Sequence, residues 1–129
     1  MVKLLFLMTG GALGTLARYL ASGLAHRLTG SLFPVGTLLV NAAGSLLIGI
    51  AWALWEQSSV PSYIRLFVLV GFFGGFTTFS SFSLETMNLI RDNEIKLALF
   101  NILANNILGI LMVFGGFFLT RLLIQTIDQ

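Results

Sequence analysis

Glycines, hydroxyls and phenyl rings gather in one stretch of the chain, residues 71–83, which reads GFFGGFTTFSSFS. Its three glycines lower the helix propensity of an otherwise apolar segment. Its threonines and serines carry hydroxyls that need hydrogen-bond partners wherever water is excluded. Phe76, Phe79 and Phe82 recur at every third position, so they form one ridge along a helix. These residue types together predict a broken helix that lines a site or a path for a small solute.

The composition places this stretch in a membrane. Of the 129 residues, 57% are hydrophobic and 9% are charged, whereas about 25% of residues are charged in soluble domains. The chain has no cysteine and one histidine, which excludes disulfides, thiolate metal sites and multi-histidine metal sites. The net charge of +2 comes from few residues and forms no basic cluster, so nucleic acid is not an expected partner. Lipid is.

A spanning helix needs about 20 apolar residues, so the length allows four such helices. We predict an all-α membrane protein with a single domain, residues 1–129, and helices at about residues 3–25, 35–55, 64–90 and 97–123. The third helix has its middle at residue 77, so the interruption falls at mid-membrane. Irregular backbone at that depth is tolerated where it is buried in protein or lines a wet cavity, and its carbonyls can bind a cation.

Polar residues recur inside the other predicted helices. Asn41 shares one face of the second helix with Ser45, and its amide serves either helix packing or a site, two readings that the sequence leaves open. Asn101, Asn105 and Gly109 share a face of the fourth helix at four-residue spacing, which predicts contact with a polar path or another helix.

Two charged residues lie at a similar depth beyond the midplane. Arg18 belongs to the first predicted helix and Glu85 to the third. Because charges inside a membrane normally find partners, we predict an Arg18–Glu85 ion pair.

The cationic residues are divided almost evenly between the two predicted membrane surfaces. Three lie at one end of the helices and three at the other, with Arg18 deeper: Lys3, Arg65 and Arg121 against Arg27, Arg91 and Lys96. Orientation follows an excess of lysine and arginine on the cytoplasmic side, and here that excess is nearly absent. The chain is therefore expected to insert both ways and to form an antiparallel dimer. The two interruptions would then meet near the twofold axis, where their carbonyls could cage one cation.

The chain resembles the Fluc (CrcB-type) fluoride channel family over nearly its whole length. The resemblance rests on residues 10–14 (GGALG) with Arg18, on residues 36–41 (GTLLVN), and above all on residues 74–85 (GGFTTFSSFSLE). It implies a dual-topology antiparallel homodimer with two fluoride pathways in a bacterial inner membrane. Cytoplasmic fluoride would leave passively, which relieves its toxicity, and the protein would not be an enzyme.

The resemblance also implies roles for individual residues. Phe79 and Phe82 would contact fluoride through their ring edges, and Asn41 would donate its amide. The fluoride pathway as a whole would comprise Phe79, Phe82, Asn41, Thr37, Ser81, Asn101 and Asn105. Gly74 and Thr77 would offer main-chain carbonyls to a central structural sodium ion at the dimer interface, the one cofactor expected. Arg18 would be the helix-1 arginine of the family, with an electrostatic or structural role that it shares with Glu85.

The fourth helix departs from the family pattern. Relatives can place a tyrosine and serines along a polar track, where this chain has Asn101, Asn105 and Gly109. A one-residue shift would bring in Asn106 instead.

Two other classes of function stay open on the sequence. A small proton- or sodium-coupled transporter would need a titratable residue at the midplane, and none is evident. A structural membrane subunit would use the glycines and asparagines for packing alone. The sequence has no ATP motif and no row of proton-relay carboxylates, which favours a passive channel over a pump.

Overall fold

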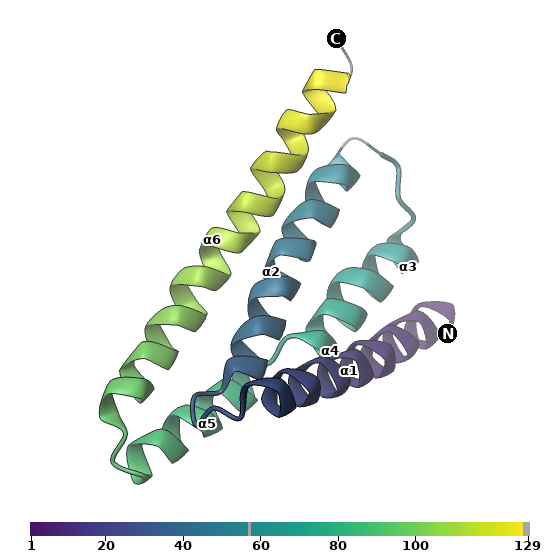
Figure 1. Ribbon diagram of the computed structural model, residues 1–129. Helices are drawn as coiled ribbons and strands as arrows, with labels where there is room; N and C mark the ends of the chain where they lie inside the picture. The colour runs from purple at the N-terminus through teal and green to yellow at the C-terminus, as the bar shows by residue number, and fades with distance from the viewer. Residues whose placement is uncertain (57, 128–129) are drawn as a thin grey trace.

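The computed structural model describes residues 1–56 and 58–127, and this part of the chain is helical with no strand. Gln57 of the predicted second loop and the last two residues of the predicted domain lie outside the described residues. The helices, in chain order, are α1 (Val2–Thr29), α2 (Val35–Glu56), α3 (Ser62–Arg65), the π-helix η1 (Leu66–Phe73), α4 (Gly74–Phe76), α5 (Phe79–Arg91) and α6 (Ile95–Ile127) (Figure 1). Four segments are long and apolar enough to cross a membrane: α1, α2, Ser62–Arg91 and α6.

The helices extend beyond the predicted bounds at several ends. α1 continues through His26, where a loop was predicted, and stops at Gly30, whose left-handed φ of 55° suits glycine. The Gly30 N–H donates to the His26 carbonyl at 3.0 Å and caps the helix. α6 likewise exceeds the predicted residues 97–123. Apolar runs mark the membrane-spanning part of a helix, while capping residues set where the helix ends.

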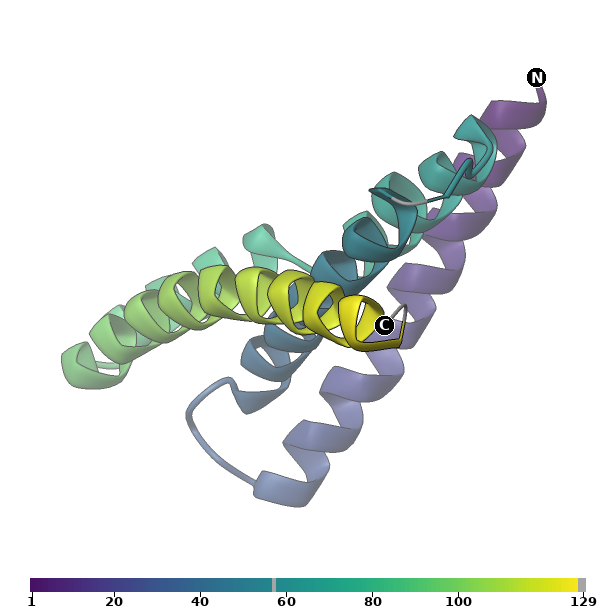
Figure 2. The same cartoon turned by 90° about the horizontal axis from the view of Figure 1, so that it is seen from above.

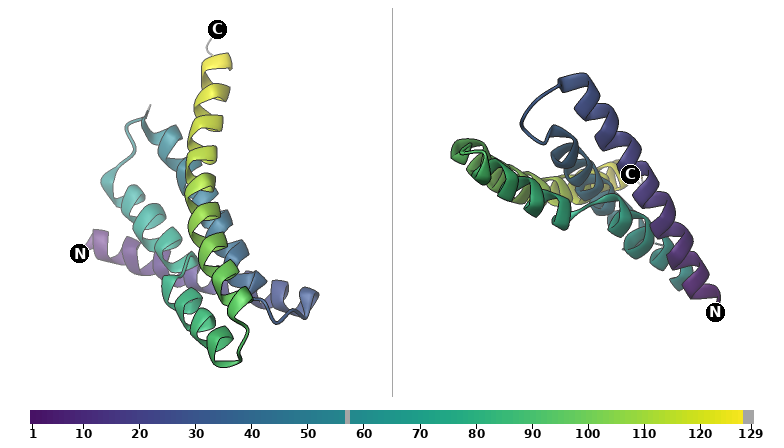
Figure 3. Two further views of the ribbon diagram at one scale, coloured as in Figure 1. Left: turned by 90° about the vertical axis from the view of Figure 1, so that its left-hand side faces the viewer. Right: turned by 90° about the horizontal axis from the view of Figure 1, so that it is seen from below.

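α2 lies at the centre of the fold. It packs against α1 on one side and against α6 on the other, and α1 and α6 make no contact with each other in the described chain. Figure 2 shows α2 between them, and Figure 3 shows α1 running steeply across the direction of α6. The segment η1–α4 packs on α1, and α5 packs on α6. The interruption between α4 and α5 is therefore near the middle of the molecule.

Glycines allow the closest helix contacts. At Gly14 of α1 a Cβ atom would collide with the Phe72 carbonyl, and at Gly116 of α6 it would collide with the Leu46 carbonyl. Small residues let membrane helices approach until their backbones touch. The packing of α1 on η1 and of α6 on α2 thus depends on these positions.

Large apolar side chains cover the outside of the described chain, including long rows on α1 and α6. The buried apolar core is small by comparison and consists of Val40, Ala42, Ala53, Phe73, Phe82, Leu89 and Ala98. Such a surface is suited to lipid or to another protein chain rather than to water.

The third spanning segment leaves helical geometry at two residues. α4 ends at Phe76, Thr77 (φ −83°, ψ 158°) and Thr78 (φ −150°, ψ 121°) are extended, and α5 begins at Phe79. Thr77 closes the first half, since its N–H and its hydroxyl donate to the Phe73 carbonyl at 2.9 and 2.8 Å. The Thr78 hydroxyl caps the second half by accepting the Ser81 N–H at 3.1 Å. Hydroxyl-bearing residues thus stabilise both helix ends at the interruption.

Candidate functional site

Asn41 of α2 binds the extended backbone at the interruption. Its Oδ1 accepts the Thr78 N–H at 2.8 Å, and its Nδ2 donates to the Thr78 carbonyl at 3.1 Å. The same Nδ2 donates to Oδ1 of Asn105 on α6 at 2.9 Å. Because backbone groups outside a helix need partners away from water, this one amide satisfies both backbone polar groups of Thr78. The interruption is thereby tied to α2 and α6.

A cavity of about 230 Å³ lies at this point, and we call it the break cavity. Its lining comes from α2, the interruption, α5 and α6 and consists of Asn41, Ser45, Thr77, Thr78, Phe79, Phe82, Asn105 and Asn106. The side chains are amides, hydroxyls and two phenyl rings, without a formal charge. Such a lining offers hydrogen-bond donors and electropositive ring edges to a small ion.

The two phenyl rings of the break cavity differ in exposure. Phe82 is 7% exposed, whereas Phe79 is 75% exposed on the outside of the chain. Their ring centroids are 5.3 Å apart with an interplanar angle of 61°. Phe79 thus stands at the outer rim of the cavity and Phe82 at its buried wall.

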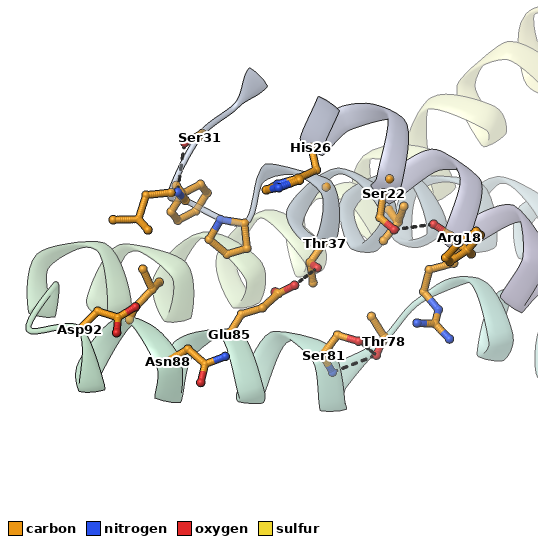
Figure 4. A pocket seen from close by; sticks show the side chains of 18 residues that line it. Arg18, Ser22, His26, Ser31, Thr37, Thr78, Ser81, Glu85, Asn88 and Asp92 are labelled. Carbon is orange, nitrogen blue, oxygen red and sulfur yellow. Dashed lines mark hydrogen bonds between the residues drawn. The ribbon is translucent and has the colours of Figure 1, made fainter. Parts of the chain in front are cut away.

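A larger cavity of about 480 Å³ lies between α1, the loop that follows it, α2 and α5 (Figure 4), and we call it the vestibule cavity. Arg18, Thr37, Ser81 and Glu85 are among its lining residues. The Thr37 hydroxyl donates to Oε1 of Glu85 at 2.6 Å. Thr78 lines both this cavity and the break cavity, so the interruption stands between the two.

The predicted Arg18–Glu85 ion pair is not formed between these two described residues. Arg18 donates from Nε to the Gly75 carbonyl at 3.0 Å, while Glu85 accepts from Thr37. Figure 4 shows the Glu85 side chain directed at Thr37 and the Arg18 guanidinium apart from it. The physical reason is the end of α4, where the last carbonyls of a helix lack intrahelical donors. Arg18 supplies one of those donors.

A third cavity, of about 220 Å³, adjoins the interruption and has Gly44, Ser45, Phe73, Gly74 and Thr77 in its lining. Hydrogen bonds reach the carbonyls of residues 73, 75 and 78. The Gly74 and Thr77 carbonyls are not among these acceptors at the described interruption. The two residues predicted to hold sodium are thus brought to one cavity.

The asparagines of α6 take different places. Asn105 lines the break cavity, as does Asn106, whose Nδ2 donates to the Ile102 carbonyl of its own helix at 2.7 Å. Asn101 is 0% exposed and reaches the cavity through Asn105, which donates to its Oδ1 at 2.9 Å. Asn101 itself donates to the hydroxyl of Thr86 at 3.0 Å. Sequence reasoning missed Thr86, although its position one helical turn after Phe82 placed it on the same face.

Comparison with known proteins identifies the family. Residues 5–117 match the family model described as "CrcB-like protein, Camphor Resistance (CrcB)". The chain belongs to the CrcB family. Among CrcB relatives, a protein of Parabacteroides distasonis named "Fluoride-specific ion channel FluC" is 46% identical over 127 residues, covering 98% of this chain and 99% of the relative. Proteins with the same name from Desulforapulum autotrophicum and Nitrosococcus oceani are 45% and 43% identical over 122 residues, covering 94% of this chain and 98% of each relative.

CrcB membership confirms the predicted family, and the match spans every residue of the vestibule cavity and of the break cavity. With four segments able to cross a membrane, this CrcB protein is a multi-pass membrane protein. Its helical class is confirmed over the described residues.

Proposed function

We propose that the chain forms a fluoride-selective channel that lets cytoplasmic fluoride leave the cell passively and so relieves its toxicity. The observation that carries this proposal is the similarity, over nearly the full length, to relatives named as fluoride-specific ion channels. The break cavity gives the ion a place, because amides, hydroxyls and ring edges can replace the water around a small anion.

The proposed pathway passes from the vestibule cavity through the interruption to the break cavity. Thr37 and Ser81 lie in the vestibule cavity, and Arg18 beside them attracts anions into it. Asn41, Phe79 and Phe82 then contact the ion in the break cavity, and Asn105 supplies the oxygen that the ion displaces as the acceptor of Asn41. Thr78, which lines both cavities, marks the transfer between them. Asn101 supports Asn105 from behind.

We infer from the hydrogen bonds at the interruption how an anion is received. Both N–H groups of Asn41 already donate, one to Thr78 and one to Asn105. Fluoride in the break cavity takes the place of the Asn105 oxygen as acceptor, and the bond returns to Asn105 when the ion leaves. Such an exchange costs little and adds no fixed positive charge, which keeps binding weak enough for conduction.

The assembly that we propose is an antiparallel, dual-topology homodimer in a bacterial inner membrane, with each helix interruption at mid-membrane. The even division of lysine and arginine supports insertion in both directions. The exposed ring of Phe79 leaves the break cavity incomplete on the outside of a single chain, and the exposed Gly74 leaves the third cavity incomplete in the same way. A second copy would supply the missing wall.

We further propose that the carbonyls of Gly74 and Thr77 from both copies hold one structural sodium ion on the twofold axis. Unwound backbone carbonyls are the sodium ligands of other broken membrane helices. The fit rests on the cavity that both residues line and on the hydrogen bonds at the interruption, which reach neighbouring carbonyls instead. The ion would bind the dimer and not the separated chains.

Replacing sodium with N-methylglucamine at constant ionic strength should therefore weaken the dimer. A ligand present at about 100 times its dissociation constant stabilises the state that binds it by about 2.7 kcal/mol. The dimer dissociation constant should then rise roughly a hundredfold, measured by single-molecule subunit capture in liposomes over a dilution series. An unchanged dissociation constant would remove sodium from the proposal.

Purified protein in liposomes tests the proposed activity against the alternatives. A passive channel carries charge, so fluoride efflux should need valinomycin to move compensating potassium. A proton-coupled transporter would release fluoride without valinomycin, and a structural subunit would release none. Either of those results would reject the channel.

A further inference from the structure

We propose that Thr86 and Asn101 are positioning residues for the ion pathway: together they hold the Asn105 oxygen toward Asn41, at the wall of the break cavity. This inference rests on the proposed function for its effect on flux. Its structural part concerns the side-chain amides alone.

Thr86 sets the direction of the first hydrogen bonds in the network. The Thr86 hydroxyl donates to the Phe82 carbonyl at 2.8 Å, so its oxygen is left to accept. It accepts from Nδ2 of Asn101 at 3.0 Å. Thr86 therefore fixes which end of the Asn101 amide faces it, and the Asn101 oxygen is directed to the other side.

Asn105 continues this direction along α6. The Asn101 oxygen accepts from Nδ2 of Asn105 at 2.9 Å, and the Asn101 carbonyl accepts from the same nitrogen at 3.1 Å. Both N–H groups of Asn105 are then used on the buried side. Its Oδ1 is left for Asn41, which donates to it at 2.9 Å.

The backbone of Thr78 fixes the opposite end of the network. The N–H and the carbonyl of Thr78 hold the Asn41 amide in one orientation, with a donor toward Asn105. An Asn105 amide turned by 180° would present a donor to that donor. The backbone at the interruption and the hydroxyl of Thr86 thus require the same orientation of Asn105.

Burial makes it costly for the Asn101 amide to lose its hydrogen bond to Thr86. Asn101 is 0% exposed and Thr86 is 7% exposed, so water does not replace a lost hydrogen-bond partner there. Without the Thr86 hydroxyl, the Asn101 nitrogen loses its acceptor, and turning the amide toward Asn105 regains one. Asn105 must then turn as well, which removes the acceptor that Asn41 uses in the break cavity.

Thr120 provides a matched control. It is a buried threonine on α6, and its hydroxyl donates to the Gly116 carbonyl at 2.8 Å, the same bond that Thr86 makes to residue 82. The described structure gives its oxygen no side-chain donor comparable to Asn101. Thr86→Val and Thr120→Val therefore remove the same local bond, and only the first disturbs the amides.

In liposomes, Thr86→Val should lower fluoride flux about tenfold, the scale of one lost hydrogen bond of about 1.4 kcal/mol. Thr86→Ser should restore it, and Thr120→Val should keep the wild-type flux. Equal fluxes of Thr86→Val and Thr120→Val would overturn the positioning role, as would failure of Thr86→Ser to restore flux.

Nuclear magnetic resonance of protein labelled with ¹⁵N-asparagine tests the amides without reference to flux. In the wild-type protein, the side-chain N–H groups of Asn101 and Asn105 should exchange slowly with deuterium, and those of exposed Asn106 fast. Equally fast exchange of the Asn101, Asn105 and Asn106 side-chain amides would overturn the proposed hydrogen-bond network. This measurement uses the wild-type protein, so it does not depend on the folding of any variant. If the wild-type protein shows the slow exchange but conducts no fluoride, the proposed function is rejected. The orientation of the amides would still be supported.

Discussion

Phe79→Ile should cut fluoride flux roughly tenfold or more while the dimer stays intact. Isoleucine keeps an apolar side chain at the rim of the break cavity but has no electropositive ring edge to face the anion. Loss of one such contact at the conduction barrier, about 1.4 kcal/mol, corresponds to a factor of ten in rate. Phe82→Ile should act in the same direction from the buried wall. A fluoride-selective electrode that follows efflux from liposomes provides the measurement.

Phe118→Ile is the matched control for Phe79→Ile. Phe118 is also an exposed phenylalanine, at 56%, and it lies on α6 outside all three cavities described above. Its replacement should leave flux unchanged. If Phe79→Ile conducts as well as Phe118→Ile, the ring of Phe79 serves packing and not permeation.

Asn41→Asp should have a larger effect, a loss of roughly a hundredfold or more. The aspartate still accepts the Thr78 N–H, but it cannot donate to the Thr78 carbonyl or to Asn105, so two hydrogen bonds are lost. It also places a negative charge beside an anion, and two like charges about 4 Å apart repel by about 4 kcal/mol at an effective dielectric constant of about 20. Both changes raise the barrier for fluoride. Initial rates of efflux at matched protein density measure the effect.

Asn93→Asp makes the same chemical change in the turn between α5 and α6, outside the three cavities. Its flux should match that of the wild-type protein. Wild-type flux through Asn41→Asp would place the permeation path away from the break cavity.

Residue chemistry alone located the interruption but did not supply its partners. Glycine, threonine and serine within residues 71–83 predict a departure from helix, and the extended residues are Thr77 and Thr78. The Asn41 amide could be assigned to packing or to a site, and the structure gives it contacts that serve both. Those contacts join residues 37 and 64 positions apart, a distance over which a periodic pattern carries no information.

The charged residues show the same limit. Matching depth along two helices predicted that Arg18 and Glu85 would pair. Depth does not reveal the Gly75 carbonyl or the Thr37 hydroxyl, which are the partners in the structure. A four-residue spacing likewise placed Asn101 and Asn105 on one face. It could not tell that Asn101 is buried behind Asn105, because burial depends on how α5 packs over α6.

Efflux of fluoride and of chloride from liposomes that contain the purified protein, both measured with valinomycin present, tests the proposed channel most directly. We expect fluoride to leave rapidly and chloride to remain, because the break cavity is lined by uncharged donors suited to a small anion. Equal efflux of the two anions, or no fluoride efflux above that of protein-free liposomes, would contradict a fluoride-selective channel.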